Sequence, residues 1–382
     1  MIPKAERLHS VEEYYFSKKL REVATLEKEG KPIINMAIGS PDLQPPQKVI
    51  QALEATSKLE NAHSYQSYQG IPALRLAMCD FYDKNYKVSL NENEVMPLMG
   101  SKEGVMMISL AFLNVGDEVL IPDPGYPTYT SVTKLVGAKP VFYNLNAKNN
   151  WLPDFEELEN QNLEKVKIMW VNYPHMPTGT KGTADAFQKI VSFAKKHQIL
   201  VVNDNPYSFI LNENPLSILA TDGAKEVALE LNSLSKSFNM AGWRVGLVVG
   251  SEKYIKAILQ VKSNMDSGMF LGIQKGAIAA LKTSNEWLAN LNAIYEKRRK
   301  IVWEIMEVLN CTYSKNSSGL FVWGKLPNGI NEIDLTDKLL SNNNIFIAPG
   351  SIFGTNGKGY IRASLCVPVV KLKEALQRLI TV

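Results

Sequence analysis

One lysine of the sequence lies among side chains that could support covalent chemistry. Lys236 belongs to the segment SLSKSFNMAGWRVG, residues 233–246, where it stands between Ser235 and Ser237 and upstream of Arg244. A lysine amine can form a Schiff base with a carbonyl compound, and hydroxyl and guanidinium groups can together hold a phosphate. Most lysines of serine-rich loops are simply hydrated, so these residue types alone leave both interpretations open.

Two further segments carry polar groups at the ends of predicted elements. The segment GSKEG, residues 100–104, precedes an apolar helical stretch. Free N–H groups at a helix start, together with the hydroxyl of Ser101, could bind a phosphate, although an ordinary helix cap is the alternative. Asp204 ends a very apolar strand and Tyr207 follows it. An aspartate that caps a turn is the alternative there.

An arginine occupies a short predicted strand within the segment GYIRAS, residues 359–364. A buried guanidinium needs an anionic partner, which could be a protein carboxylate or a ligand. From this segment alone, a structural ion pair and a ligand site for Arg362 are about equally supported.

The elements that must position these groups alternate along the chain. Short apolar runs cover residues 33–38, 118–121, 140–143, 167–172, 199–203, 227–232 and 245–249, and helical stretches include residues 12–29, 102–113, 184–197 and 252–265. Strands that are apolar throughout are buried on both faces, which is typical of a mainly parallel sheet between helices. Ligands of such sheets bind at the carboxyl ends of the strands.

The last third of the chain has a different pattern. It predicts helices at residues 286–309, 333–341 and 370–380 and strands at residues 320–323, 345–348 and 360–363. We therefore expect an α/β protein with a large domain of residues 41–280. A smaller α+β domain would be formed by both termini, residues 1–40 and 281–382.

The composition is that of an ordinary globular chain. Its 382 residues include 42 Lys+Arg and 38 Asp+Glu, a net charge of +4, with 45% hydrophobic residues. This balance argues against a protein that binds nucleic acids or membranes through bulk charge. The N-terminus shows no signal peptide, and Cys79, Cys311 and Cys366 form no CxxC pair, which favours a reducing cytoplasm. The four histidines show no metal-ligand spacing, so no metal is expected.

The segment of residues 233–246 resembles, position for position, the lysine signature of class I and II aminotransferases, pyridoxal-phosphate enzymes of fold type I. Other family landmarks follow in order from Gly39 to Arg362. The resemblance implies a seven-stranded, mainly parallel sheet in the large domain. It also implies that Lys236 holds pyridoxal 5'-phosphate covalently and transfers the substrate's proton.

The resemblance assigns the cofactor contacts residue by residue. The residues that would hold the cofactor phosphate are Ser101, Lys102, Ser233, Ser235 and Arg244. Tyr126 would stack on the pyridine ring, and Asp204 would pair with the ring nitrogen. Tyr207 would form a hydrogen bond with the phenolic oxygen, and Asn172 would begin the turn that lies beside the cofactor. Lys236, Asp204 and Tyr207 would thus be the catalytic residues. We interpret Tyr129 as an ordinary packing aromatic.

The turn NYPHMPTG, residues 172–179, departs from the family pattern. Met176 stands where an asparagine normally donates a hydrogen bond to the phenolic oxygen of the cofactor. Methionine cannot donate, so we hypothesise that the ionisation of the bound cofactor is altered while the enzyme stays active.

The resemblance also implies substrate and partner contacts. Gly39 would lie near the substrate carboxylate and Arg362 would bind that carboxylate through its bidentate fork. Lys102 would bind a distal carboxylate of the substrate; the alternative is that Lys102 is simply hydrated or contacts the helix end. Tyr65 would reach the phosphate of a partner subunit, which implies a homodimer with shared active sites.

The expected function is an aminotransferase of amino-acid metabolism that follows a ping-pong mechanism, with aspartate and 2-oxoglutarate as the first choice of substrates. Diaminopimelate and aromatic or kynurenine-type donors stay open. A lyase on the same fold, either a carbon–sulfur lyase or a cyclopropane-forming synthase, is an alternative, and a non-catalytic ligand sensor is less favoured because Lys236 is retained.

Overall fold

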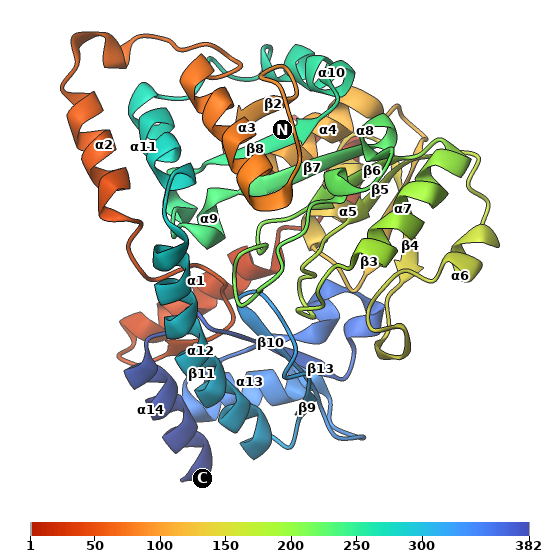
Figure 1. Cartoon of the computed structure of the whole chain (residues 1–382). Coiled ribbons are helices and arrows are strands. Elements are labelled where there is room, and N and C mark those ends of the chain that lie inside the picture. The colour runs from red at the N-terminus through yellow and green to blue at the C-terminus, as the bar shows by residue number, and fades with distance from the viewer. Residues whose placement is uncertain (1, 382) are drawn as a thin grey trace.

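The larger sheet contains seven strands in the computed structural model, which describes residues 2–381. Its strand order is β2-β8-β7-β6-β5-β3-β4, and Figure 1 shows this sheet in the upper part of the molecule. The strands are β2 (Val95–Leu98), β3 (Glu118–Asp123), β4 (Lys139–Asn144), β5 (Val166–Val171), β6 (Leu200–Asp204), β7 (Ala228–Ser233) and β8 (Gly246–Gly250). The strands from β7 to β4 are parallel, whereas β8 is antiparallel to both of its neighbours. The expectation of a mainly parallel, seven-stranded sheet is confirmed.

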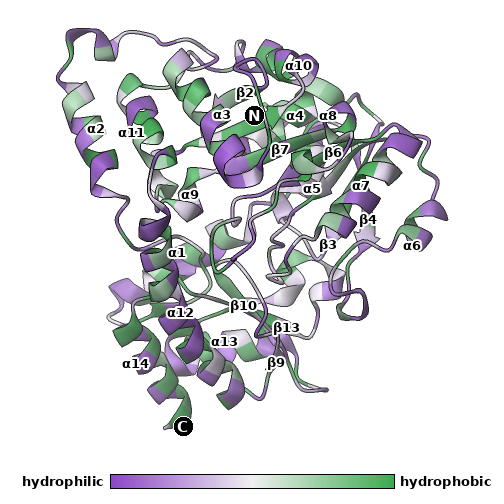
Figure 2. Cartoon of the chain, in the orientation of Figure 1, coloured by the Kyte–Doolittle hydropathy of each residue, from purple (hydrophilic) through white to green (hydrophobic). Residues whose placement is uncertain are grey.

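Helices cover both faces of this sheet, as fully apolar strands require. The helices are α2 (Gln47–Ser57), α3 (Pro72–Tyr86), α4 (Ser101–Phe112), α5 (Pro127–Leu135), α6 (Phe155–Glu159), α7 (Ala184–His197), α8 (Ala224–Val227), α9 (Leu234–Ser237), α10 (Glu252–Lys262) and α11 (Leu271–Leu281). One face packs against α3, α7 and α11, and the other against α4, α5 and α10. In Figure 2 the strands are largely hydrophobic, while outer helices such as α7 show both colours.

The second body is smaller and combines segments from both ends of the chain. A four-stranded sheet has the order β12-β13-β10-β9, and β1 pairs with β11. Its elements are β1 (Ile34–Asn35), β9 (Thr312–Tyr313), β10 (Phe321–Lys325), β11 (Ile345–Phe346), β12 (Ala348–Pro349), β13 (Tyr360–Ser364), α12 (Asn285–Val308), α13 (Glu332–Asn343) and α14 (Val369–Ile380). The run at residues 345–348 was expected to be one strand, and the structure divides it into two. The exact domain boundaries stay a prediction.

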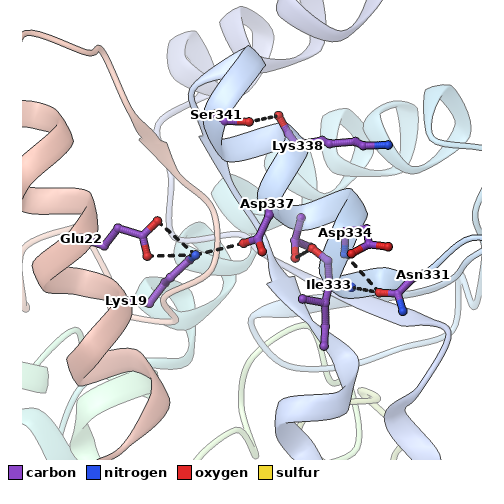
Figure 3. A network of polar contacts seen from close by, with 9 residues as sticks. Lys19, Glu22, Asn331, Ile333, Asp334, Asp337, Lys338 and Ser341 are labelled. Atoms are coloured by element: carbon purple, nitrogen blue, oxygen red, sulfur yellow. Dashed lines mark hydrogen bonds and ion pairs between the residues drawn. The ribbon is translucent and has the colours of Figure 1, made fainter.

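The N-terminal helix α1 (Tyr15–Lys28) lies against the smaller body. Lys19 bridges Glu22 of its own helix and Asp337 of α13, with the Nζ–carboxylate distance to Asp337 at 3.0 Å (Figure 3). This contact holds the start of α1 beside the junction of the two bodies. No helix among residues 2–381 is long and apolar enough to cross a membrane.

Short 3₁₀ helices complete the chain at Glu6–Ser10, Glu60–His63, Ala147–Asn149, Ile218–Ala220, Ala241–Trp243, Gly350–Phe353 and Thr355–Gly357.

Candidate active site

A cavity of about 590 Å³ lies where the carboxyl ends of the central strands meet the smaller body. Its volume is within the range of small-molecule sites, about 300–1,000 Å³. The expected site residues that line it are Gly39, Ser101, Lys102, Tyr126, Asn172, Asp204, Tyr207, Ser233, Ser235, Lys236, Arg244 and Arg362. Tyr65 does not line it, because its side chain is 89% exposed on the surface of this chain. The structure therefore brings these residues together in one cavity from segments far apart in the chain.

Lys236 lies at the centre of this cavity. It belongs to α9, the single turn that follows the buried strand β7, and its Nζ donates a hydrogen bond to the carbonyl oxygen of Gly39 at 2.5 Å. Burial lowers the pKa of Lys236 below its ordinary value, and the positive charges of Arg362 and Arg244 lower it further. An amine with a lowered pKa is more often neutral, so it can act as a nucleophile and as a base.

Asp204 ends β6 and is buried. Its Oδ2 accepts a hydrogen bond from the Tyr129 hydroxyl at 2.8 Å. Burial raises its pKa to about 6, while the Tyr129 hydrogen bond opposes this rise. Within the described residues, its Oδ1 has no hydrogen-bond partner. A buried acceptor without a protein donor fits a protonated nitrogen of a ligand.

Tyr129 corrects one sequence interpretation. It does pack, with its ring stacked 4.8 Å from that of Trp170, but its hydroxyl is also the donor to Asp204. Both Tyr126 and Tyr129 line the cavity, at the start of α5 and one turn later. Tyr129 is thus more than the packing aromatic that we inferred from the sequence.

A second buried carboxylate lies in the strand next to Asp204. Glu230 of β7 pairs in register with Asn203 of β6. Its oxygens accept hydrogen bonds from the Tyr82 hydroxyl at 2.9 Å, the Asn203 amide at 2.9 Å and the backbone N–H of Ile218 at 3.1 Å. Its negative charge contributes to the raised pKa of Asp204. Glu230 was not predicted from the sequence, although a glutamate between Leu229 and Leu231 in a buried strand was an available signal.

The turn after β5 is held by the side chain of Asn172. Its Oδ1 accepts from the backbone N–H of Met176 at 2.8 Å, and its amide nitrogen donates to the Asp204 carbonyl. Asn172 therefore fixes the position of Met176 relative to Asp204. The Met176 side chain is buried and lines the cavity beside Arg362.

Arg244 lies directly against the start of α4. A Cβ on Gly100 would stand 2.2 Å from Nη2 of Arg244, and a Cβ on Gly246 would stand 2.5 Å from the backbone nitrogen of Ser101. Glycines at these two positions allow the arginine and the helix start to come together. The guanidinium and the helix N-terminus both favour an anion at this end of the cavity.

The hydroxyl of Ser233 caps the next helix, α9, by accepting from the backbone N–H of Ser235 at 3.2 Å. Both serines are buried and line the cavity near Arg244. Together with Ser101 they supply hydroxyl donors, so this end of the cavity fits a phosphate.

Arg362 is a buried residue of β13, a strand of the smaller body. The ring centroids of Phe321 and Phe353 lie 3.8 and 4.4 Å from its Cζ. Its Nη2 donates to the Ala37 carbonyl at 2.7 Å, and its Nη1 lies 3.1 Å from the Met176 sulfur. It has no carboxylate partner among the described residues, which favours a ligand over the structural ion pair.

An ion pair fixes the segment that carries Gly39. The carboxylate of Asp42 accepts from both terminal nitrogens of Arg298, at 2.6 and 2.8 Å. A Cβ on Gly39 would stand 2.2 Å from Phe321, so only glycine allows the segment to lie this close.

These groups fit pyridoxal phosphate as an anionic, aromatic ligand with a ring nitrogen. The anion site of Ser101 and Arg244, the unpaired buried oxygen of Asp204 and the amine of Lys236 lie in one cavity. Tyr126 adds an aromatic face. Gly100 and Gly246 contribute to this fit, because they allow Arg244 and the start of α4 to come together.

The chain matches the family model described as "Aminotransferase class I and II" over residues 31–379. It is 39% identical over 378 residues to LL-diaminopimelate aminotransferase of Dehalococcoides mccartyi, covering 98% of this chain and 97% of that protein. The enzyme of the same name from Aquifex aeolicus is 36% identical over 382 residues, covering 99% of each. The structure of apo-BacF from Bacillus subtilis superposes with a TM-score of 0.95 at 35% identity, covering 99% of this chain and 98% of that one.

Proposed function

The chain belongs to the class I and II aminotransferase family, whose cofactor is pyridoxal 5'-phosphate, and on that premise we propose that it transfers the amino group of an L-amino acid to 2-oxoglutarate. The observation that carries the proposal is the partly buried Lys236 amine, with its lowered pKa, in one cavity with Asp204 and Arg362. An amine, an acidic partner for a ring nitrogen and a carboxylate receptor are the three groups that amino transfer requires.

Each residue has a role that follows from its position. When bound, the cofactor withdraws electrons from the substrate's α-carbon so that this carbon can lose a proton. Ser101, Ser233, Ser235 and Arg244 hold the phosphate, with Lys102 at the same helix start. Tyr126 would offer its aromatic face to the ring, and Asp204, which accepts a hydrogen bond from Tyr129, would keep the ring nitrogen protonated. Tyr207 and Asn172 complete the ring's polar surroundings.

The substrate's α-carboxylate is bound by Arg362, whose planar guanidinium is held rigidly between Phe321 and Phe353. This contact and the Gly39 segment set the direction of the α-carbon. Lys236, as a neutral amine, would take the α-proton and hold it as an ammonium beside the substrate, ready to be given back. Because the same cavity serves the donor and then the oxo acid, the kinetics are ping-pong.

The proposed assembly is a homodimer in which Tyr65 of each subunit completes the phosphate site of the other. The support is that Tyr65 is 89% exposed and outside the cavity of its own chain. Mixing Lys236→Ala subunits with Tyr65→Ala subunits tests this. A hybrid dimer has one site with both residues intact, so activity should exceed that of either variant alone. No recovery in verified hybrids contradicts the shared site.

The donor is the finer part of the proposal. Aspartate is the expectation from the sequence, since Lys102 lines the cavity and could read a distal carboxylate. The relatives from Dehalococcoides mccartyi and Aquifex aeolicus carry the name of diaminopimelate, which makes it a second candidate. The location in a reducing cytoplasm stays a prediction.

The test is a panel of L-amino acids with 2-oxoglutarate, read by the formation of glutamate and of the matching 2-oxo acid. We expect transfer by the wild type and none by Lys236→Ala. Release of ammonia or pyruvate without glutamate would identify a lyase instead. Appreciable transfer by Lys236→Ala would contradict the assignment of this lysine.

A further inference from the structure

Part of the cavity lining beside Arg362 and Lys102 is built from apolar side chains. Tyr14, Phe16 and Leu20 come from the start of α1, Ile38 precedes Gly39, and Phe321 comes from β10. Phe16 and Phe321 are buried, with 6% of each exposed. We call these five residues the apolar wall.

The apolar wall is held in place from several sides. The Lys19–Asp337 bridge fixes α1 to the smaller body (Figure 3). The Phe16 ring packs 6.4 Å from that of Phe353 and 5.5 Å from Cζ of Arg362. The wall therefore lies next to the guanidinium that binds the α-carboxylate, where the side chain of a bound amino acid must go.

Negative charge is scarce in this cavity. Among residues 2–381, Asp204 is the only carboxylate that lines it, and Asp204 is committed to the cofactor. A donor with a second amino group would have to bury an ammonium without an anionic partner, which is unfavourable.

The proposed dimer does not supply the missing charge through the loop of Tyr65. The segment NAHSYQSYQG, residues 61–70, contains neither aspartate nor glutamate. Its polar groups are hydroxyls, amides and an imidazole, so it offers an ammonium no carboxylate.

Lys102 at the edge of the cavity has an aromatic neighbour. Lys102 Nζ lies 4.9 Å from the centroid of Tyr14, and no ion pair joins it to a described residue. Burial lowers its pKa, and the nearby charge of Arg244 adds to this. A lysine at the edge of the wall suits the distal carboxylate of the acceptor 2-oxoglutarate, while the wall itself suits an apolar donor.

We propose that the donor is an L-amino acid with a single amino group and a large apolar side chain, with aromatic side chains preferred. The proposal rests on the proposed function and concerns the side-chain specificity of the same site. It separates this chain from an enzyme for diaminopimelate, which carries two amino groups, and it places aspartate below the aromatic donors.

The first experiment compares kcat/KM for L-phenylalanine, L-tyrosine, L-aspartate, L-lysine and LL-diaminopimelate, each with 2-oxoglutarate. Matching an apolar side chain to an apolar pocket changes kcat/KM by roughly 10- to 200-fold. We expect the aromatic donors to exceed aspartate and diaminopimelate by about ten-fold or more. If transfer occurs but aspartate or diaminopimelate is the best donor, this inference is wrong and the proposed function stands. If no donor reacts, the proposed function itself is wrong.

A binding measurement tests the wall independently of turnover. The probes 3-phenylpropionate and 6-aminohexanoate each carry one carboxylate for Arg362 and differ in the tail that meets the wall. Calorimetry on the cofactor-loaded enzyme should show tighter binding of 3-phenylpropionate. Equal affinities, or a preference for 6-aminohexanoate, would overturn the proposal.

A matched pair of variants tests the missing charge. Leu20→Glu adds a carboxylate at the partly exposed edge of the wall, where Leu20 is 39% exposed. It should raise kcat/KM for LL-diaminopimelate relative to phenylalanine by about two- to five-fold, the effect of a partly exposed ion pair. The control Leu76→Glu changes a leucine that is 53% exposed on α3 and outside the cavity. An unchanged ratio in Leu20→Glu, or the same change in Leu76→Glu, contradicts the wall as the specificity determinant.

Discussion

Replacing Tyr129 by phenylalanine removes the one side chain among residues 2–381 that donates to the Asp204 carboxylate. The Tyr129 hydroxyl lies 2.8 Å from Oδ2 of Asp204, and both side chains are buried. A hydrogen bond to a charged group contributes about 1.5–3 kcal/mol. Since one pKa unit corresponds to about 1.36 kcal/mol, its loss should raise the pKa of Asp204 by about one to two units.

The sign of the pH effect follows from burial. The pKa of Asp204 is already raised to about 6, so the carboxylate is protonated below that pH and ionised above it. Only the ionised form supports a protonated ring nitrogen, so cofactor affinity should fall as the pH drops through about 6 in the wild type. In Tyr129→Phe the same fall should begin about one to two units higher.

The assay is a titration of cofactor-free enzyme with pyridoxal phosphate at a series of pH values. The ionisations of the free cofactor are the same in every titration, so the difference between the variants reports Asp204. Tyr143→Phe is the matched control, because the buried Tyr143 hydroxyl donates to the Trp170 carbonyl at 2.8 Å and does not contact Asp204. An unchanged pH dependence in Tyr129→Phe, or an equal shift in Tyr143→Phe, would refute the reasoning.

Three further predictions follow from other contacts. Met176→Asn restores a donor beside the cofactor's phenolic oxygen, so the pH midpoint of the visible absorbance of the bound cofactor should fall; an unchanged or higher midpoint contradicts our hypothesis. Glu230→Gln removes a negative charge that raises the pKa of Asp204, so the fall in cofactor affinity should move to lower pH, opposite to Tyr129→Phe, and a shift to higher pH contradicts this. Asp42→Asn leaves the buried Arg298 without its carboxylate and should lower the free energy of unfolding by about 3 kcal/mol in urea, the lower end of the range for broken buried pairs because Asp42 is 24% exposed. The control Asp337→Asn, at an exposed pair, should cost less than about 1 kcal/mol; equal losses in the two variants contradict the role of burial.

Most elements of the large sheet could be predicted from the sequence because its strands are apolar along their whole length. The exception is β2 (Val95–Leu98), which we did not expect. Pro97 lies within it, and proline cannot donate to a sheet, which argues against a strand. The structure places β2 at the edge, where it pairs with β8 alone. The direction of a strand could not be predicted either, because an apolar run such as β8 has the same residue pattern in a parallel and in an antiparallel strand.

Candidate residues of the site could be predicted from the sequence where they lie within a recognisable motif. Asp204, Lys236 and Arg244 each stand in a segment that resembles the family pattern. Tyr129 and Glu230 were not found, because their roles depend on a hydroxyl or a carboxylate that meets Asp204 or its neighbour across strands.

The apolar wall could not be predicted from the sequence either. Tyr14 and Phe16 reach the cavity only through the docking of α1, whose Phe16 and Val23 are buried in the core of the smaller body, and whose Lys19 meets Asp337 from far along the chain. A helical pattern indicates that a helix has an apolar face, and it does not indicate what that face covers.

The most direct test of the central claim locates the covalent link between cofactor and protein. The enzyme loaded with pyridoxal phosphate is treated with borohydride, digested and examined by mass spectrometry. We expect a pyridoxyl phosphate group on the peptide that contains Lys236, and no such group in Lys236→Ala. A group on a different lysine of the wild type, or none at all in a protein that binds the cofactor, would contradict the account.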